Sequence, residues 1–273
     1  MSYTYADLAQ RVREVAPLTH CLTNSVVPEI TANVLLAVGA SPAMVNHPEE
    51  SRIFAGIADA LLINVGNITD PDVAAMRAAI EGAQKAGTPW VLDPVAVGGL
   101  PVRTEFARSL VSGAYPPAAI RGNASEILGL AGHSGRGRGV DSGDSADDAL
   151  EAARELASRT GAIVAISGPT DIIVSEHTTT HVRGGHELMP QVIGTGCSLG
   201  AVVASYLGVH SDDLALRHAA VVAAHAHCAG AGTRAGADPQ VKGPGTFAPV
   251  WLDCLVHGPE SVEACTIAEG AHD

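Results

Sequence analysis

Residues 60–94, ALLINVGNITDPDVAAMRAAIEGAQKAGTPWVLDP, contain two short apolar runs separated by a helical pattern. The runs at 60–66 and 90–94 are brief and end in Asn, Asp, Gly or Pro, as buried strands of a parallel sheet do. Between them, Asp70-Pro71 predicts a capped helix start, and Gly87 predicts the helix end. This stretch therefore predicts a strand, a helix and a second strand of an α/β fold.

The same alternation continues towards the C-terminus. Runs at 118–123 and 162–168 predict two further strands, and Ser145 opens a helical pattern that ends near Gly161. DIIVSE and THVRGG (180–185) then predict a local antiparallel hairpin on the same sheet. The last third of the chain reads as nearly all helical. We expect one domain, residues 1–273, with a central, mostly parallel sheet flanked by helices.

Composition narrows the class of protein. The chain has 273 residues, is 47% hydrophobic and carries a net charge of −13, which argues against a nucleic-acid partner. No apolar run reaches membrane length and no secretory signal is visible, so we expect no membrane partner. The five cysteines form no C-x-x-C pair; they stand at 21, 197, 228, 254 and 265. We expect a soluble, reduced protein of the cytoplasm.

A glycine-rich stretch, VIGTGCSLG at 192–200, precedes an apolar helical run. Gly194, Thr195 and Gly196 are expected to form the turn into that helix. The first N–H groups of a helix point outward without partners, and the helix dipole adds positive charge there, so this turn predicts an anion site. A cysteine in that field, Cys197, is expected to have a lowered pKa and a reactive thiolate.

Polar residues stand at the ends of the predicted strands, where ligands bind in open α/β sheets. Asp93 ends one strand, and Glu126 follows the next; these two carboxylates are predicted to hold Mg²⁺ together with substrate phosphates. Arg121 could bind nucleotide phosphates, and Ser167 ends the fourth strand. The combination favours phosphoryl transfer.

Two other groups of residues invite a ligand. Asn24 precedes a helix that starts near Pro28, and Met44 follows a predicted short strand, so both could line a small, mildly polar pocket. A second group, with three histidines and a cysteine, could suggest a metal site: His218, His225, His227 and Cys228. Because 225 and 227 cannot share one helix face, we interpret these side chains as packing or solvent-facing instead.

The assembled motifs resemble those of the hydroxyethylthiazole kinases, within the ribokinase-like superfamily. The resemblance covers nearly the whole chain, in family order: PLTHCLTNSVV, TANVLLAVGASPAM, ALLINVG, WVLDPVAVGG, AIRGNASEI, GRGVDS, VIGTGCSLGAVVA and KGPGTF. Residues 123–126 resemble the superfamily's N-x-x-E motif, which is linked with Mg²⁺ and phosphate. Residues 194–197 resemble its G-x-G-D anion hole, with Cys197 where most relatives carry the catalytic Asp base.

The resemblance implies a ribokinase-like fold and ATP-dependent phosphorylation of the primary alcohol of 4-methyl-5-(2-hydroxyethyl)thiazole, for thiamine synthesis or salvage. It implies thiazole contacts by Met44 and Gly194, to which we add Asn24. It implies ATP contacts by Arg121 and by Ser167, where the family often has Thr. We add Asn123 on the ATP side. The family also implies a homotrimer with sites between subunits.

Three alternatives stay open. A related kinase could act on hydroxymethylpyrimidine, although the GTGC motif disfavours it. A binding protein without turnover would not need Asp93, Glu126 and Cys197 together. A cysteine hydrolase would need a histidine oriented on the thiol. A Walker motif is absent, and GTGCSLG is one residue too long for a dinucleotide fingerprint.

Overall fold

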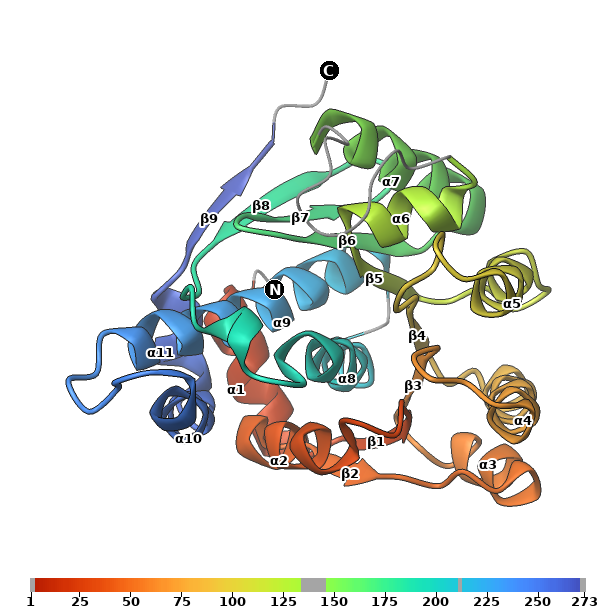
Figure 1. The fold of residues 1–273 in the computed structure, drawn as a ribbon, viewed down its shortest axis with the longest axis horizontal. Helices are drawn as coiled ribbons and strands as arrows, with labels where there is room; N and C mark the ends of the chain where they lie inside the picture. Colours follow the sequence, from red (N-terminus) through yellow and green to blue (C-terminus); the bar gives the residue numbers. More distant parts are fainter. Residues whose placement is uncertain (1–2, 134–145, 211–212, 271–273) are drawn as a thin grey trace.

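The computed structural model describes residues 3–133, 146–210 and 213–270. Within these residues the strands form one nine-stranded sheet in the order β2-β1-β3-β4-β5-β6-β7-β8-β9 (Figure 1). Pairing is parallel from β2 through β6 and antiparallel from β6 through β9. The strands are β1 (Leu18–Leu22), β2 (Ser41–Ala43), β3 (Ala60–Asn64), β4 (Trp90–Asp93), β5 (Ala119–Asn123), β6 (Ile163–Ser167), β7 (Asp171–Val174), β8 (Thr179–Arg183) and β9 (Thr266–Glu269).

The sheet confirms the strand predictions. The four apolar runs form β3, β4, β5 and β6, and the hairpin forms β7 and β8. The expectation of a nearly all-helical last third misses β9. That strand has only four residues and is mostly exposed, so it shows no apolar pattern. It pairs antiparallel with β8, and Ile267 is its side chain that packs against the core.

The helices begin and end close to the predicted residues. Thr69, rather than Asp70, caps α4, because the Asp72 carboxylate accepts hydrogen bonds from the N–H and hydroxyl of Thr69. Ser145, which is expected to open the helical pattern that ends near Gly161, lies outside the described residues, as do residues 134–144. The α-helices are α1 (Tyr5–Val15), α2 (Pro28–Val38), α3 (Pro48–Ala55), α4 (Asp70–Ala86), α5 (Pro101–Val111), α6 (Ala124–Ala131), α7 (Ala146–Thr160), α8 (Thr195–Leu207), α9 (Leu214–Gly236), α10 (Pro244–Leu255) and α11 (Gly258–Glu263).

Two layers of helices cover the sheet, one on each face (Figure 1). Alternate strand residues serve the two faces: Leu61 and Ile63 belong to the core under α3 to α7, whereas Leu62 belongs to the core under α1, α2, α8, α9 and α10. Burial on both faces explains why these strands are continuous apolar runs rather than alternating ones.

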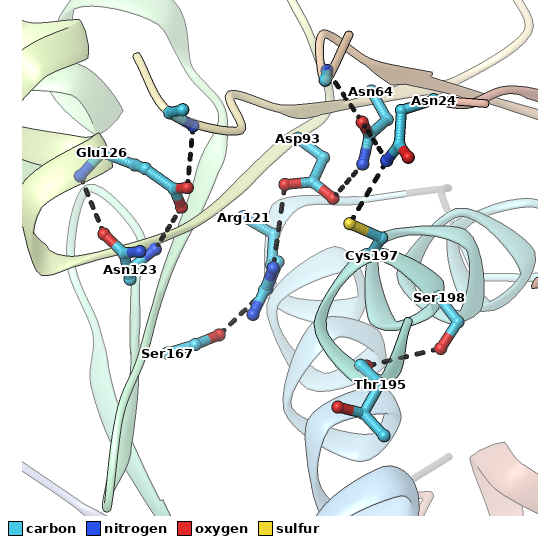
Figure 2. Close-up of polar contacts among 12 residues, drawn as sticks. Asn24, Asn64, Asp93, Arg121, Asn123, Glu126, Ser167, Thr195, Cys197 and Ser198 are labelled. Carbon is cyan, nitrogen blue, oxygen red and sulfur yellow. Dashed lines mark hydrogen bonds and ion pairs between the residues drawn. The ribbon is translucent and has the colours of Figure 1, made fainter. Parts of the chain in front are cut away.

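Helix α8 positions the candidate site. It packs against β3 and β4 and begins near the carboxyl ends of the central strands, so the polar residues at those ends face its first turn (Figure 2). Among the described residues, no helix combines the length and the apolar character needed to cross a membrane.

Candidate active site

Gly194 sets the start of α8. Its φ is +93°, in the left-handed region, and a Cβ there would collide with Ile30 of α2. The helix itself begins at Thr195, so Thr195 and Gly196 belong to its first turn rather than to the preceding loop. The Thr195 hydroxyl donates to the carbonyl oxygen of Met189 at 2.9 Å, which fixes this turn. Only glycine therefore fits position 194 without strain.

Cys197 lies in the first turn of α8, with its Sγ 3.5 Å from Asn24 Nδ2, a distance at which the amide donates to sulfur (Figure 2). The expected lowering of its pKa is wrong. Burial raises the pKa of the Cys197 thiol, and the nearby Asp93 carboxylate raises it further, while hydrogen bonds from Asn64 and Asn24 and the charge of Arg121 oppose the rise. Loss of hydration and a negative neighbour outweigh the helix terminus.

A buried amide chain joins Cys197 to Asp93. Asn64 Nδ2 donates to Asp93 Oδ2 at 2.6 Å, and Asn24 Nδ2 donates to Asn64 Oδ1 at 3.2 Å. Asn64 and Asp93 lie side by side because their strands pair in register at these residues. Sequence reasoning placed Asn64 at a strand end but gave it no role in the site, since only the strand register brings it to Asp93.

Asp93 has no exposed surface. Burial raises the pKa of its carboxyl to about 7; Glu126 adds to the rise, and Arg121 and Asn64 oppose it. Its Oδ1 is buried without a hydrogen-bond partner and lies 3.7 Å from Arg121 Nη1. One oxygen of Asp93 is thus held by an amide, and the other faces a cation.

Arg121 is mostly buried rather than a surface cation. Its side chain is 11% exposed, and its Nε donates to Ser167 Oγ at 3.0 Å, as Figure 2 shows. A Cβ at Gly196 would lie 3.5 Å from Arg121 Nη2, so the guanidinium reaches the first turn of α8. Asp93, Arg121, Ser167 and the start of α8 therefore form one group.

Glu126 and Asn123 form a capping box at the start of α6. Asn123 Oδ1 accepts from the Glu126 N–H, and Glu126 Oε2 accepts from the Asn123 N–H at 2.8 Å. Glu126 Oε1 accepts from the N–H of Ala96, which has a φ of 57° that non-glycine residues rarely adopt. The Glu126 carboxylate therefore links the strained turn after β4 to the start of α6, and Asn123 is the N-cap residue of that helix.

Among the described residues, Met44 makes no side-chain hydrogen bond to the Cys197 group, which comprises Asn24, Asn64, Asp93, Arg121, Ser167 and the start of α8. It is partly buried and directly follows β2, the neighbour of β1, while Asn24 follows β1 itself. Their positions after adjacent parallel strands place both at the same edge of the sheet as the Cys197 group.

The carboxylates suit a Mg²⁺ ion that also binds substrate phosphates. Among residues 3–133, 146–210 and 213–270, no three His, Cys, Asp or Glu side chains gather as a metal cage. Asp93 nevertheless offers a buried, unpartnered oxygen, and Glu126 lies close enough to raise the pKa of Asp93. One or two carboxylates with phosphates and water are the usual Mg²⁺ ligands, so the donor set fits.

The histidines of α9 are all buried, which corrects the interpretation of some as solvent-facing. His218 is hydrogen-bonded to Thr180 at 2.9 Å, and His227 to Tyr206 at 2.8 Å. His225 contacts Asp171 instead, so the three rings serve three different neighbours.

Comparison with known proteins finds similarity over nearly all of the chain. The model of the hydroxyethylthiazole kinase family matches residues 9–260. A hydroxyethylthiazole kinase of Corynebacterium glutamicum (strain R) is 53% identical over 255 residues, which cover 93% of this chain and 94% of the relative. One of Kineococcus radiotolerans is 54% identical over 242 residues, covering 89% of this chain and 85% of the relative.

Solved structures are similar as well. A hydroxyethylthiazole kinase protein of Pyrococcus horikoshii OT3 matches with a TM-score of 0.85 and 31% identity, covering 98% of this chain and 99% of the other. Pyridoxal kinase of Staphylococcus aureus, in complex with AMP-PCP and pyridoxal, matches with a TM-score of 0.58 and 15% identity, covering 79% of this chain and 87% of the other. The second match concerns the fold alone, and it is the ribokinase-like fold.

Proposed function

This chain belongs to the hydroxyethylthiazole kinase family, and we propose that it transfers the γ-phosphoryl group of ATP to the primary hydroxyl of 4-methyl-5-(2-hydroxyethyl)thiazole. It is a kinase with an alcohol as acceptor, and the product is the thiazole phosphate of thiamine metabolism. The single observation that carries the proposal is the group at the start of α8. There a cation, a buried carboxylate and a thiol surround backbone N–H groups that have no helical partner.

Each member of this group has a distinct proposed role. Gly194, Thr195, Gly196 and Cys197 form the anion hole, which stabilises the charge spreading over the transferred phosphoryl group. Arg121 and Ser167, already hydrogen-bonded to each other, contact ATP, and Asn123 lies on the same side. Asn24, Met44 and Gly194 contact the thiazole. Cys197 accepts the proton of the substrate hydroxyl.

We propose Asp93 and Glu126 as the carboxylates of the Mg²⁺ site. Asp93 and Glu126 would hold the ion, which would supply positive charge to neutralise the negative charge of the phosphates. Asp93 keeps one oxygen fixed by Asn64 and presents the other, and Glu126 holds the turn after β4 in place.

We also propose a cytoplasmic homotrimer, built from one domain per chain, with its sites between subunits. Two apolar side chains next to the site support this: Val26 is 58% exposed and Ile193 is 71% exposed. They adjoin Asn24 and Gly194, so a second copy covering them would also close the pocket.

The proposed reaction is tested by measuring ATP consumption with hydroxyethylthiazole, with hydroxymethylpyrimidine and without an acceptor, each with Mg²⁺ and with excess chelator. We expect turnover only with the thiazole alcohol and Mg²⁺. Turnover with the pyrimidine alone would replace the proposed substrate, and full activity in chelator would remove the metal from the proposal.

Met44→Ala is expected to raise the KM for the thiazole about tenfold and to leave the KM for ATP within about twofold. Truncating a buried Met usually costs about 2–5 kcal/mol, but this side chain is only partly buried, so the loss falls mainly on the ligand contact. Steady-state kinetics with each substrate varied in turn measures the split. A large fall in Tm with an unchanged KM for the thiazole would make Met44 a core residue only.

Glu126→Gln is expected to lower kcat about 10- to 100-fold and to raise the Mg²⁺ concentration needed for half-maximal activity. Glu126 accepts one hydrogen bond from the N–H of Ala96 and one from the N–H of Asn123. Gln can accept only one of the two, because its NH₂ group would face the other N–H, donor against donor. Glu155→Gln is the matched control, since it removes the same charge from an exposed side chain of α7 that is no part of the proposed site. An unchanged Mg²⁺ requirement in Glu126→Gln would place Glu126 outside the metal site.

A further inference from the structure

The buried histidine His225 reaches towards the nucleotide side of the site from α9. It has no exposed surface, and its Nδ1 lies 2.7 Å from Asp171 Oδ2 at the start of β7. An ionised carboxylate only accepts hydrogen bonds, so His225 Nδ1 carries the proton and donates it. The other ring nitrogen, Nε2, is buried and has no hydrogen-bond partner among the described residues. A neutral ring leaves no unsatisfied N–H there, so this tautomer fits the site.

Asp171 in turn holds the turn between β6 and β7. Its Oδ1 accepts a hydrogen bond from the Gly168 N–H at 3.0 Å. Gly168 directly follows Ser167, the last residue of β6, whose Oγ accepts from Arg121 Nε at 3.0 Å. A continuous path therefore runs from α9 through one carboxylate and one peptide unit to the guanidinium beside the anion hole.

We infer that Asp171 and His225 are positioning residues for the nucleotide: the hydrogen-bonded pair fixes the 168–171 turn and, through it, the Ser167 hydroxyl that orients Arg121. This inference rests on the proposed ATP contacts of Ser167 and Arg121. Gly168 and Pro169 are exposed at the carboxyl end of β6, so the outer side of the turn is open to a ligand, while its inner side is anchored. If the turn is already ordered in the free protein, ATP binding does not carry the entropy cost of ordering it, so the affinity for the nucleotide is higher.

If the hydrogen bond between His225 and Asp171 only connects α9 to β7, a different result is expected. It would lower stability and affect both substrates equally. The positioning role affects nucleotide binding selectively, so the two are separated by measuring the affinities for nucleotide and alcohol along with the melting temperature.

Asp171→Ala removes both hydrogen bonds. We expect the Kd of a non-hydrolysable ATP analogue, measured by calorimetry, to rise about tenfold, with the Kd of the thiazole alcohol, measured in the same way, within about twofold of wild type. Asp171→Asn should raise the Kd only about threefold, because its amide oxygen can still accept from Gly168. Its NH₂ would need the ring proton of His225 to move to the buried Nε2, which has no acceptor among the described residues, so the second hydrogen bond is not restored at full strength. His225→Leu keeps the Gly168 bond and should raise the Kd by about threefold.

His218→Gln is the matched control, because His218 is a buried histidine of the same helix whose partner, Thr180, lies on β8. It should leave the Kd of the analogue unchanged even if Tm falls. A Kd within twofold of wild type in folded Asp171→Ala overturns the inference, as does an equal rise for both substrates. If Asp171→Ala does not fold, His225→Leu decides in the same way. Calorimetry requires no turnover, so a wild-type chain that binds the analogue but does not phosphorylate the thiazole alcohol defeats the proposed reaction without touching this test.

Discussion

Asp93→Asn is expected to lower kcat by about 10³-fold, the size of the loss when a preorganised group facing transition-state charge is removed. The amide can satisfy its neighbours in only one way: its oxygen accepts from Asn64 Nδ2, and its NH₂ then faces the Arg121 guanidinium, donor against donor. The variant therefore removes a negative charge, the proposed metal ligand and the acceptor that Arg121 faces. Single-turnover phosphorylation over a range of Mg²⁺ concentrations measures the loss.

The fold should survive this change. The pKa of Asp93 is raised to about 7 by burial, which means that its ionised form is unfavourable in the folded chain. Removing that charge offsets the loss of the partner of Arg121, so we expect Tm to shift by only a few degrees. Glu155→Gln, an exposed acid on α7, is the control for removal of one negative charge. A kcat within tenfold of wild type would remove Asp93 from the chemistry.

The second large effect is expected at Cys197. If the thiolate takes the alcohol proton, kcat of the wild type should rise with pH, because the base form is the deprotonated one. Burial and Asp93 raise the pKa of this thiol, so we expect the increase in kcat at a pH above that at which an ordinary thiol ionises. Cys197→Ser should lose the rise and lower kcat by about 10²-fold at the alkaline end, the lower bound of general-base assistance. Backbone N–H groups survive the substitution, so activity should remain measurable.

Cys197→Asp should remain active and should lack the alkaline rise of the wild type. A carboxylate titrates far below a thiol, and the helix start favours its ionised form, although the neighbouring Asp93 opposes it. Pre-steady-state phosphorylation by the three proteins at several pH values makes the comparison, with ATP binding and Tm as controls. Complete loss in a folded Asp variant that still binds ATP would refute the proton-acceptor role, and so would a wild-type kcat that does not change with pH.

Sequence alone predicts β3, β4, β5 and β6 because each is a buried apolar run of its own, but it does not predict β1 or β9. It finds Asp93, Arg121 and Ser167 because each stands at or near a strand end. It cannot predict the sign of the pKa shift at Cys197. A helix start lowers a thiol pKa, but burial and a carboxylate brought in by another strand raise it, and both depend on tertiary packing. The residues of the site stay predictions in their roles, and the structure adds how they contact one another.

Asn64 and Asp171 show the same limit. Each is a polar residue at a strand terminus, and the neighbouring sequence does not distinguish a site residue from one that only caps a turn or a helix. The parallel register of β3 with β4 brings Asn64 to Asp93, and the packing of α9 brings His225 to Asp171. Such contacts join residues 29 and 54 positions apart, so no pattern within a helix or strand encodes them.

The two helical layers also differ in the order in which their residues are synthesised. The core under α3 to α7 draws on residues from Leu22 to Val174, so every side chain it needs has been synthesised before α8 exists. The opposite core begins at Leu8 but needs residues from Leu199 to Val262. The residues of one layer are therefore all synthesised while those that cover Leu62 and Val91 on the other face are still to come. Cys197 belongs to that later part of the chain, so the proposed anion hole cannot form before the residues that close the second core begin to be made.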